Sequence, residues 1–315
     1  MEYLRLVRMR SIEVYIGVCL LLGLWGAVAA SAMQQSTRFV LASVVDSLTD
    51  TPIAGLSPDD FIVQEGTTPR ETIAVRPANY PVAILVDTSQ AARAEFTRMR
   101  KAVRQLVARM SGRDVAIYSF GDRAFRVTDF TRDTTRLERA VDQLFALPDG
   151  ESHVLDAVIE AGKDLARREP AVAMIVVVSA GANDQSNRTP REVFEPVLAS
   201  RSIVHVVEMR SIGASGRLGN VRGRRNFTSD RAAEAALGLQ ELLQDLVART
   251  RGDYDRVFAG SGYSASLDRL YQRLNAEVVV EYTSAGGPPS DLRIGTRLAG
   301  GAVRGIGLDR APRQP

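Results

Sequence analysis

From residue 81 onward, continuous apolar runs alternate with stretches whose apolar residues recur every three or four positions. The run at 81–86 ends in Asp87, and the stretch after it keeps its apolar residues on one helical face until Gly112. The run from Ile175 to Val178 is apolar on both faces, as a strand must be when helices cover both sides of a parallel sheet. This alternation predicts an α/β fold with a doubly wound, mostly parallel sheet.

The same periodicities predict where the elements of this sheet lie. Strands are expected at 81–86, 115–120, 125–130, 174–178, 203–207 and 254–258, and helices at 96–110, 137–145, 155–166, 193–198, 232–247 and 267–274. The chain is 45% hydrophobic and 24% charged, which is ordinary for a globular protein. This composition argues against wholesale disorder and against a polytopic membrane protein.

The two ends of the chain have a different, β-rich pattern. Residues 37–78 contain short strand-like runs and one capped helical turn at 57–60, and the tail has three further strand-like runs. Because these segments flank the α/β core, we expect them to pair into a small β sandwich. The predicted division is 1–32 as a signal peptide, 33–78 as an N-terminal β segment, 79–275 as the α/β domain and 276–315 as a C-terminal β segment that pairs with 33–78.

The first 32 residues have the layout of an export signal. Arginines near the N-terminus precede an uncharged apolar stretch at 14–30, and Ala30-Ser31-Ala32 supplies small residues for cleavage. We expect cleavage after Ala32 and a periplasmic or extracellular protein; the alternative is a membrane anchor formed by residues 14–30. The single cysteine, Cys19, lies in this segment, so the exported chain would have no thiol.

The charge of the chain does not indicate nucleic acid as a partner. The formal net charge is +3, and only Lys101 and Lys163 among its 40 basic residues are lysines. Four arginines lie in the Gly/Ser/Asn-rich stretch 211–229, where they fit a solvated loop better than a grip on an acidic partner or lipid headgroups.

Three segments that follow or connect the predicted strands resemble the von Willebrand factor type A domain. Asp87 and Ser89 match the first two positions of that family's Asp-x-Ser-x-Ser motif, and Ala91 stands at the third. Ser152 stands at the position of a threonine before a middle helix, and Ala180 at the position of an aspartate after the fourth strand. The resemblance covers 81–258 and implies the family's fold, with protein or envelope components as partners. The lead-in at 45–66 and the closing pattern at 252–282 resemble a group of exported bacterial proteins with a related domain.

In that family, these positions form a metal-ion-dependent adhesion site. Magnesium takes about six oxygen ligands and usually needs carboxylate charge. Only Asp87, Ser89 and Ser152 retain side-chain oxygens, so we expect a degenerate site without a cofactor, with weak magnesium binding as the alternative. Asn183 and Asp184 lie close by in sequence and are further candidate ligands. For Asp87 and Ser89 themselves, we favour a structural role over metal binding: they are expected to cap a helix beginning near Ala91.

No catalytic motif stands out in the sequence. A phosphate loop, an HExxH motif and a complete nucleophile elbow are all absent, and His205 reads as a strand residue of the core. We therefore favour a non-enzymatic interaction module that binds at the carboxyl edge of the sheet through Asp87, Ser89, Ala91, Ser152 and Ala180. The alternative is an envelope hydrolase that uses Asp87, Ser152 and His153 at the same edge.

Overall fold

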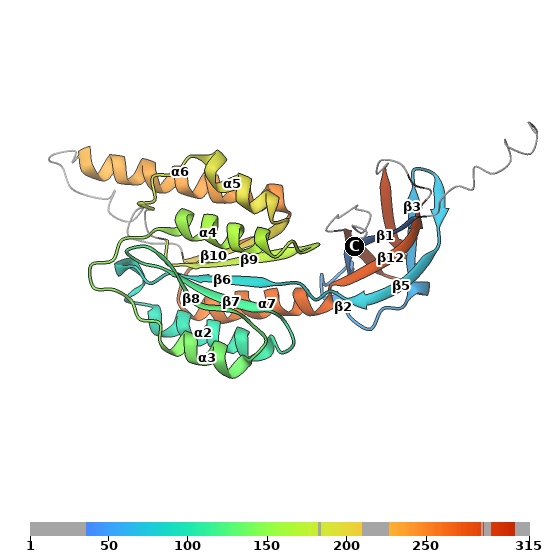
Figure 1. The fold of residues 1–315 in the computed structure, drawn as a ribbon, viewed down its shortest axis with the longest axis horizontal. Helices are drawn as coiled ribbons and strands as arrows, with labels where there is room; N and C mark the ends of the chain where they lie inside the picture. The colour runs from blue at the N-terminus through green and yellow to red at the C-terminus, as the bar shows by residue number, and fades with distance from the viewer. Residues whose placement is uncertain (1–35, 182–183, 210–226, 285, 287–290, 306–315) are drawn as a thin grey trace, which may run out of the picture. The chain divides into compact units, whose positions relative to one another are not determined.

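A computed structural model describes residues 36–181, 184–209, 227–284, 286 and 291–305, with the side chains of 227–234 and 305 left out (Figure 1). The chain forms two compact units. One consists of residues 43–55 and 77–278, and the other of the described parts of 1–42, 56–76 and 279–315. The predicted signal peptide, Asn183 and the stretch 211–226 lie outside the described residues. Among the described residues, no helix is both long and apolar enough to cross a membrane.

A six-stranded sheet forms the centre of the larger unit, in the order β11-β10-β9-β6-β7-β8. The strands are β6 (Val82–Val86), β7 (Val115–Phe120), β8 (Ala124–Thr131), β9 (Ala173–Ser179), β10 (Ser202–Met209) and β11 (Tyr254–Val257). All neighbouring pairs are parallel except β7 and β8, which are antiparallel. Every residue of β6 and β9 is buried, as expected for central strands covered on both faces. The predicted fold class is therefore confirmed.

Helices cover both faces of this sheet (Figure 1). One face carries α2 (Phe96–Arg109), α3 (Thr134–Asp142) and α7 (Ser261–Ala276), and the other carries α4 (Val154–Arg167), α5 (Pro190–Ala199) and α6 (Phe227–Thr250). On the second face, Leu165 and Val193 pack with strand residues such as Ile175 and Val206 in one core cluster. Burial of these apolar side chains is the main favourable term that holds each layer on the sheet.

Local chemistry sets where several of these helices begin. The Asp133 side chain accepts hydrogen bonds from the backbone N–H groups of Thr135 and Arg136 at the start of α3. Before α5, Thr189 and Glu192 form a capping box, and Pro190 occupies the first helical position. Four helices begin three or more residues before their predicted starts: α3 at 134 instead of 137, α5 at 190 instead of 193, α6 at 227 instead of 232 and α7 at 261 instead of 267. In addition, α3 ends at 142 instead of 145.

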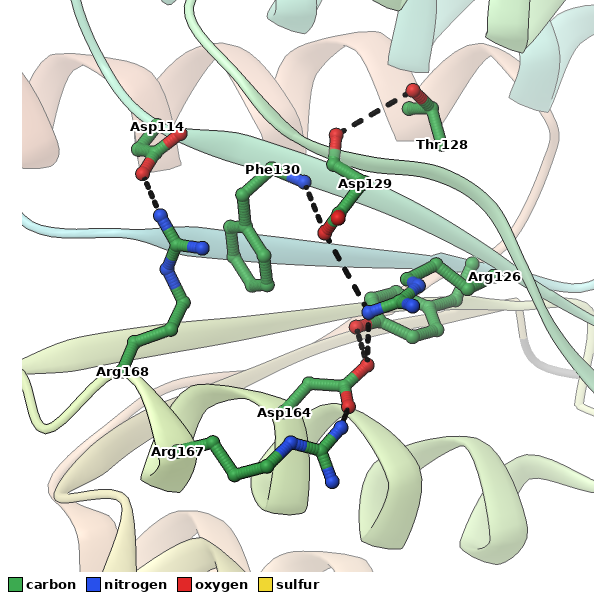
Figure 2. A network of polar contacts seen from close by, with 9 residues as sticks. Asp114, Arg126, Thr128, Asp129, Phe130, Asp164, Arg167 and Arg168 are labelled. Carbon is green, nitrogen blue, oxygen red and sulfur yellow. Dashed lines mark hydrogen bonds and ion pairs between the residues drawn. The ribbon is translucent and has the colours of Figure 1, made fainter.

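A polar network holds α4 against β7 and β8 (Figure 2). The Asp164 carboxylate is buried and accepts hydrogen bonds from the Tyr118 hydroxyl at 2.6 Å and from Arg126 at 3.0 Å. Arg167, on the same helix, also pairs with Asp164. A buried carboxylate is costly unless charged and hydrogen-bonding partners surround it, so this network fixes the helix at one position on the sheet.

The two ends of the chain build two further sheets. The first has the order β14-β1-β12-β5, with β2 paired to β1, and the second has the order β13-β3-β4. The strands are β1 (Ser36–Asp46), β2 (Pro52–Ile53), β3 (Phe61–Glu65), β4 (Thr68–Arg70), β5 (Thr72–Pro77), β12 (Val278–Ser284), β13 (Leu292–Thr296) and β14 (Gly301–Gly305), with a 3-10 turn η1 (Pro58–Asp60) before β3. N-terminal and C-terminal strands thus share sheets, as the sequence predicts.

The register of the second sheet shows how closely the ends pair. β13 lies antiparallel to β3, with Leu292 opposite Glu65 and Thr296 opposite Phe61. Glu65 is buried and lies within ion-pair distance of Arg38 and Arg70, while the Ser284 hydroxyl donates to it at 2.6 Å. One buried carboxylate therefore joins residues from both ends of the chain.

Candidate functional site

The five residues of the predicted site lie on three segments at the carboxyl edge of the six-stranded sheet. Asp87, Ser89 and Ala91 follow β6, where Ala91 lies in a 3-10 turn, η2 (Gln90–Ala92). Ser152 precedes α4, and Ala180 follows β9. Because β6 and β9 are parallel neighbours, the segments after them emerge side by side.

Backbone hydrogen bonds draw the segment before α4 onto the segment after β6. The Gln90 N–H donates to the Gly150 carbonyl, and the Leu147 N–H donates to the Thr88 carbonyl, each at 2.8 Å. A Cβ placed on Gly150 would lie 2.7 Å from the Leu147 Cβ, so the tight turn of this segment between residues 147 and 150 requires glycine. The structure therefore brings Ser152's segment against the segment that carries Asp87 and Ser89.

The Asp87 carboxylate is fully buried, and donors of the protein itself occupy both of its oxygens. Oδ1 accepts from the Ser89 N–H at 2.9 Å, and Oδ2 accepts from the Ala180 N–H at 3.0 Å. Burial raises the pKa of Asp87 above its ordinary value, and hydrogen bonds from Ser89, Ala180 and Ser179 oppose the rise. Asp87 thus ties the end of β6 to the end of β9.

The helix-cap interpretation of Asp87 and Ser89 is wrong. α2 begins only at Phe96, and the Ser89 side chain makes no capping hydrogen bond to the 3-10 turn that it precedes. The sequence Gln90-Ala91-Ala92 forms a short turn first, which moves the helix start away from both residues. The Asp87 carboxylate instead bonds across to the neighbouring strand's segment.

Two buried hydroxyls lie on the segments of this site, the Oγ atoms of Ser89 and Ser152, on residues that are 1% and 2% exposed. The Ser89 hydroxyl interacts with the Asp87 carboxylate. The Ser152 Oγ has no hydrogen-bond partner in the described part of the chain, although its backbone carbonyl accepts from the Gln185 N–H at 2.7 Å. A buried polar group without a partner is uncommon, so the Ser152 hydroxyl marks the site as unusual.

The donor set does not fit a magnesium ion. Asp87 supplies the one carboxylate, its oxygens already accept N–H donors, and Ala91 and Ala180 supply no side-chain oxygen. The carboxylate of Asp184 accepts from the Leu155 N–H at 3.2 Å and from Ser186, so it serves the start of α4. No cluster of three or more acidic, histidine or cysteine residues suited to a metal occurs among the described residues. Two hydroxyls and one carboxylate fall well short of about six oxygens.

The hydrolase alternative gains no support from the geometry. His153 Nδ1 lies 3.4 Å from Asp156 Oδ2, and Arg188 donates to the other oxygen of that carboxylate at 2.6 Å. The neighbouring Ser152 hydroxyl has no hydrogen-bond partner in the part of the chain that the structure describes, so none of those residues is in place as a base to take its proton. The second histidine, His205, is buried within β10, and burial lowers its pKa to about 4.

Sequence reasoning missed two residues beneath this edge. The buried Tyr263 hydroxyl of α7 donates to the Ser179 carbonyl at 2.7 Å, and burial raises the pKa of Tyr263, with the charges of Asp87 and Glu208 adding to the rise. Glu208 is bonded to the Tyr254 hydroxyl, and burial raises its pKa. Tyr263 occupies an ordinary core position of a helix that the periodicity predicted too short, so its sequence carried no signal for this role.

Comparison with known proteins gives one family match. Residues 82–183 match the model of the von Willebrand factor type A domain. A search of curated proteins found no match.

Three solved structures are among those whose backbone fold is similar to that of this chain. They are BatB from Bacteroides thetaiotaomicron (TM-score 0.46, 17% identity, 62% of this chain and 98% of that one), an aerotolerance-related membrane protein from Bacteroides fragilis (0.44, 18%, 62% and 99%) and a von Willebrand factor type A protein from Catenulispora acidiphila (0.47, 11%, 87% and 72%). All three TM-scores lie below 0.5, and none of these likenesses bears on the site.

Proposed function

Because residues 82–183 form a von Willebrand factor type A domain, we propose that this chain is a non-enzymatic interaction module that binds a protein partner at the carboxyl edge of its sheet. Domains of this family are generally protein-interaction modules. Binding here does not use a metal ion, and the partner contacts the loops around Asp87, Ser89, Ala91, Ser152 and Ala180 directly.

The observation that carries this proposal is the state of Asp87. The Asp87 carboxylate is fully buried, and the Ser89 and Ala180 N–H groups donate to its two oxygens at 2.9 and 3.0 Å. It is the one carboxylate of the predicted donor set, and magnesium takes more oxygen ligands than that set supplies. The remaining hydroxyls of Ser89 and Ser152 lack both a metal-binding charge and a catalytic base. What the edge offers a partner is therefore the exposed surface of its loops.

The export of the protein is part of the same proposal. The arginines before the apolar stretch 14–30 and the small residues Ala30-Ser31-Ala32 support a periplasmic or extracellular location. An uncleaved anchor at 14–30 would hold the same module at a membrane, with its partner among envelope components. N-terminal sequencing of the native protein distinguishes a start at Met33 from one at Met1.

A capture experiment tests the proposed function. The full chain is used to capture partners from envelope extract, and the variant Ala91→Trp is used beside it, because Ala91 is exposed on η2 and a large side chain there covers the edge without disturbing the core. We expect a partner that the unaltered chain retains in the presence of EDTA and that Ala91→Trp loses. A partner that Ala91→Trp retains fully places binding elsewhere and contradicts the proposal.

Activity measurements complete the test. A broad esterase and peptidase screen is expected to give no turnover, because Ser152 has no base within hydrogen-bond reach. Turnover that Ser152→Ala abolishes would replace the interaction module with the hydrolase alternative.

A further inference from the structure

We propose that the carboxyl edge selects a partner segment that presents arginine or lysine side chains between apolar ones. This inference rests on the proposed function and names the chemistry of its partner. A metal at such an edge would attract an acidic side chain, whereas an edge with more free carboxylates than free cations attracts a basic one.

Three exposed acidic residues surround Gly150 at this edge. Asp149 and Glu151 flank it in sequence, and Asp122 Oδ1, from the loop between β7 and β8, would lie 3.2 Å from a Cβ placed on Gly150. None of the three carboxylates forms an ion pair within the described part of the chain, although arginines pair with many of its other acidic residues. We call Asp122, Asp149 and Glu151 the acidic rim.

Two arginines on the neighbouring loops reduce the negative charge of this surface. Arg93 follows η2, and Arg123 follows Asp122 directly; both are exposed. The three carboxylates of the acidic rim still outnumber these two arginines. The Gln90 to Gly150 hydrogen bond joins the acidic rim to the segment after β6, which also carries the buried Asp87 carboxylate. The acids do not converge into a metal-binding group, so they suit several separate cationic contacts better than one ion.

The Ser152 hydroxyl is an independent sign that a ligand completes this edge. Ser152 is next to Glu151 of the acidic rim and is 2% exposed, and its Oγ has no hydrogen-bond partner among the described residues. Such a group gains free energy when a donor reaches it, and an ammonium or guanidinium group is a strong donor without acceptors.

Exposed phenylalanines lie on the segments next to the acidic rim. Phe145 is 66% exposed and lies two residues before Leu147, whose N–H binds the segment after β6. Phe125, at 53%, follows the loop that carries Asp122 and pairs with Ser119 near the end of β7. Aromatic side chains are enriched at protein interfaces, where they act as anchors. Basic and apolar residues in one segment would therefore meet matching groups.

A matched pair of peptides tests the inference on the full chain. One is an acetylated and amidated hexapeptide of alternating phenylalanine and arginine, and the other has glutamate in place of each arginine. In the presence of EDTA and at low salt, we expect the arginine peptide to bind at least about tenfold more tightly than the glutamate peptide. Fluorescence anisotropy of labelled peptides measures both affinities.

Variants then show whether the acidic rim carries the preference. Asp149→Asn combined with Glu151→Gln is expected to weaken binding of the arginine peptide by about fivefold. The matched control, Asp59→Asn combined with Glu71→Gln, removes two exposed acids outside the six-stranded sheet's unit and is expected to change binding by less than about twofold. Thermal unfolding checks that all variants are folded.

The outcomes separate this inference from the proposed function. Equal binding of the two peptides, no binding of either, or an equal loss in the control variant overturns the inference. If a captured partner does not bind Ala91→Trp but binds the variant with Asp149→Asn and Glu151→Gln as well as it binds the unaltered chain, the proposed function stands. The inference of a basic partner segment is then wrong. If the partner stays bound to Ala91→Trp, the proposed function itself fails.

Discussion

At the residue scale, the candidate site depends on two positions where alanine stands in place of an oxygen-bearing side chain. Ala180 is buried and uses its backbone N–H to hold Asp87, while Ala91 is exposed on η2. With both oxygens of Asp87 engaged and two possible ligands missing, little remains for a divalent cation. The same aspartate that would bind a metal instead closes the gap between β6 and β9.

Magnesium binding should therefore be weak, and restoring the missing oxygen ligands should strengthen it. We expect calorimetry to detect no magnesium or manganese affinity tighter than about millimolar, because magnesium dehydrates reluctantly and needs more oxygens than Asp87, Ser89 and Ser152 supply. The double variant Ala91→Ser with Ala180→Asp should gain measurable affinity. A double variant that gains none, although folded, would show that these positions do not form one site.

His205 is expected to make stability depend on pH between about 6.5 and 4. Burial lowers its pKa from 6.5 to about 4 in the fold, so the unfolded chain takes up a proton first as pH falls. The stability contributed by neutral His205 is complete above 6.5 and is lost as pH falls toward 4, by about 3 kcal/mol in total.

Urea unfolding at several pH values tests this prediction. His205→Gln should flatten the pH dependence over that range, whereas the same substitution at the less buried His153 should keep most of it. An unchanged pH dependence in His205→Gln would mean that another group takes up the proton.

The sequence was enough to predict which residues meet at the site, but it was not enough to predict the hydrogen bonds between them. The order of motifs placed Asp87, Ser152 and Ala180 at one edge because parallel strands end together. The contact that decides the role of Asp87 is made by a backbone N–H of Ala180, and side-chain identity says nothing about that donor. The acidic Asp122 was overlooked because its loop belongs to no family motif.

At the scale of elements, close approaches of backbone set the positions of the strands and loops around the core. Gly252 lies before β11, and a Cβ there would come within 1.8 Å of the Val204 carbonyl oxygen of β10. Asp253 continues this contact, because its N–H donates to His205 Nδ1 at 3.1 Å and its carboxylate pairs with Arg273. The segment between α6 and β11 therefore needs glycine at this position.

A pair of glycine substitutions tests this view of the elements. Gly252→Ala should destabilise the fold by about 3 kcal/mol or more, because the obstructing atom is backbone and cannot rotate away. Gly238→Ala, in the exposed interior of α6 with no atom within 4 Å of its Cβ, should stabilise it by about 0.5 to 1 kcal/mol. Thermal unfolding of both variants checks the signs; equal effects would contradict the geometry.

Element types followed from periodicity, whereas some bounds did not. β6 and β9 were predictable because uninterrupted apolar residues have no other place than a covered sheet. The first turns of α7, Ser261 to Ser266, contain glycine and serines with little apolar period, so burial of Tyr263 against the sheet extends that helix beyond its sequence signal.

At the scale of the whole molecule, the ends of the chain depend on each other through shared sheets. β12 lies between β1 and β5, and β13 pairs with β3 over five residues. We propose that 33–78 and 276–315 act as one β module and that 79–275 form a separate α/β domain. Neither segment alone can satisfy the backbone groups of its strands or cover side chains such as Phe61 and Val63.

Truncation tests this dependence. A chain ending at residue 278 loses β13, β14 and nearly all of β12, so we expect it to expose β1 and β3 and to aggregate. The control, residues 77–278, keeps the six-stranded sheet and the hydrogen bond from Tyr80 to Glu277, and should remain monomeric. Light scattering compares the two. A monomeric 1–278 chain with unchanged hydrogen-exchange protection in β3 would show that the ends are independent.

The central claim is that a partner binds the carboxyl edge of this domain without a metal ion. Hydrogen exchange measured by mass spectrometry, on the full chain with its captured partner in EDTA, tests it most directly. We expect new protection in the segments 87–95, 121–123 and 147–153, with the same pattern when magnesium is added. Protection confined to the terminal sheets, or protection of the edge that appears only with magnesium, would contradict it.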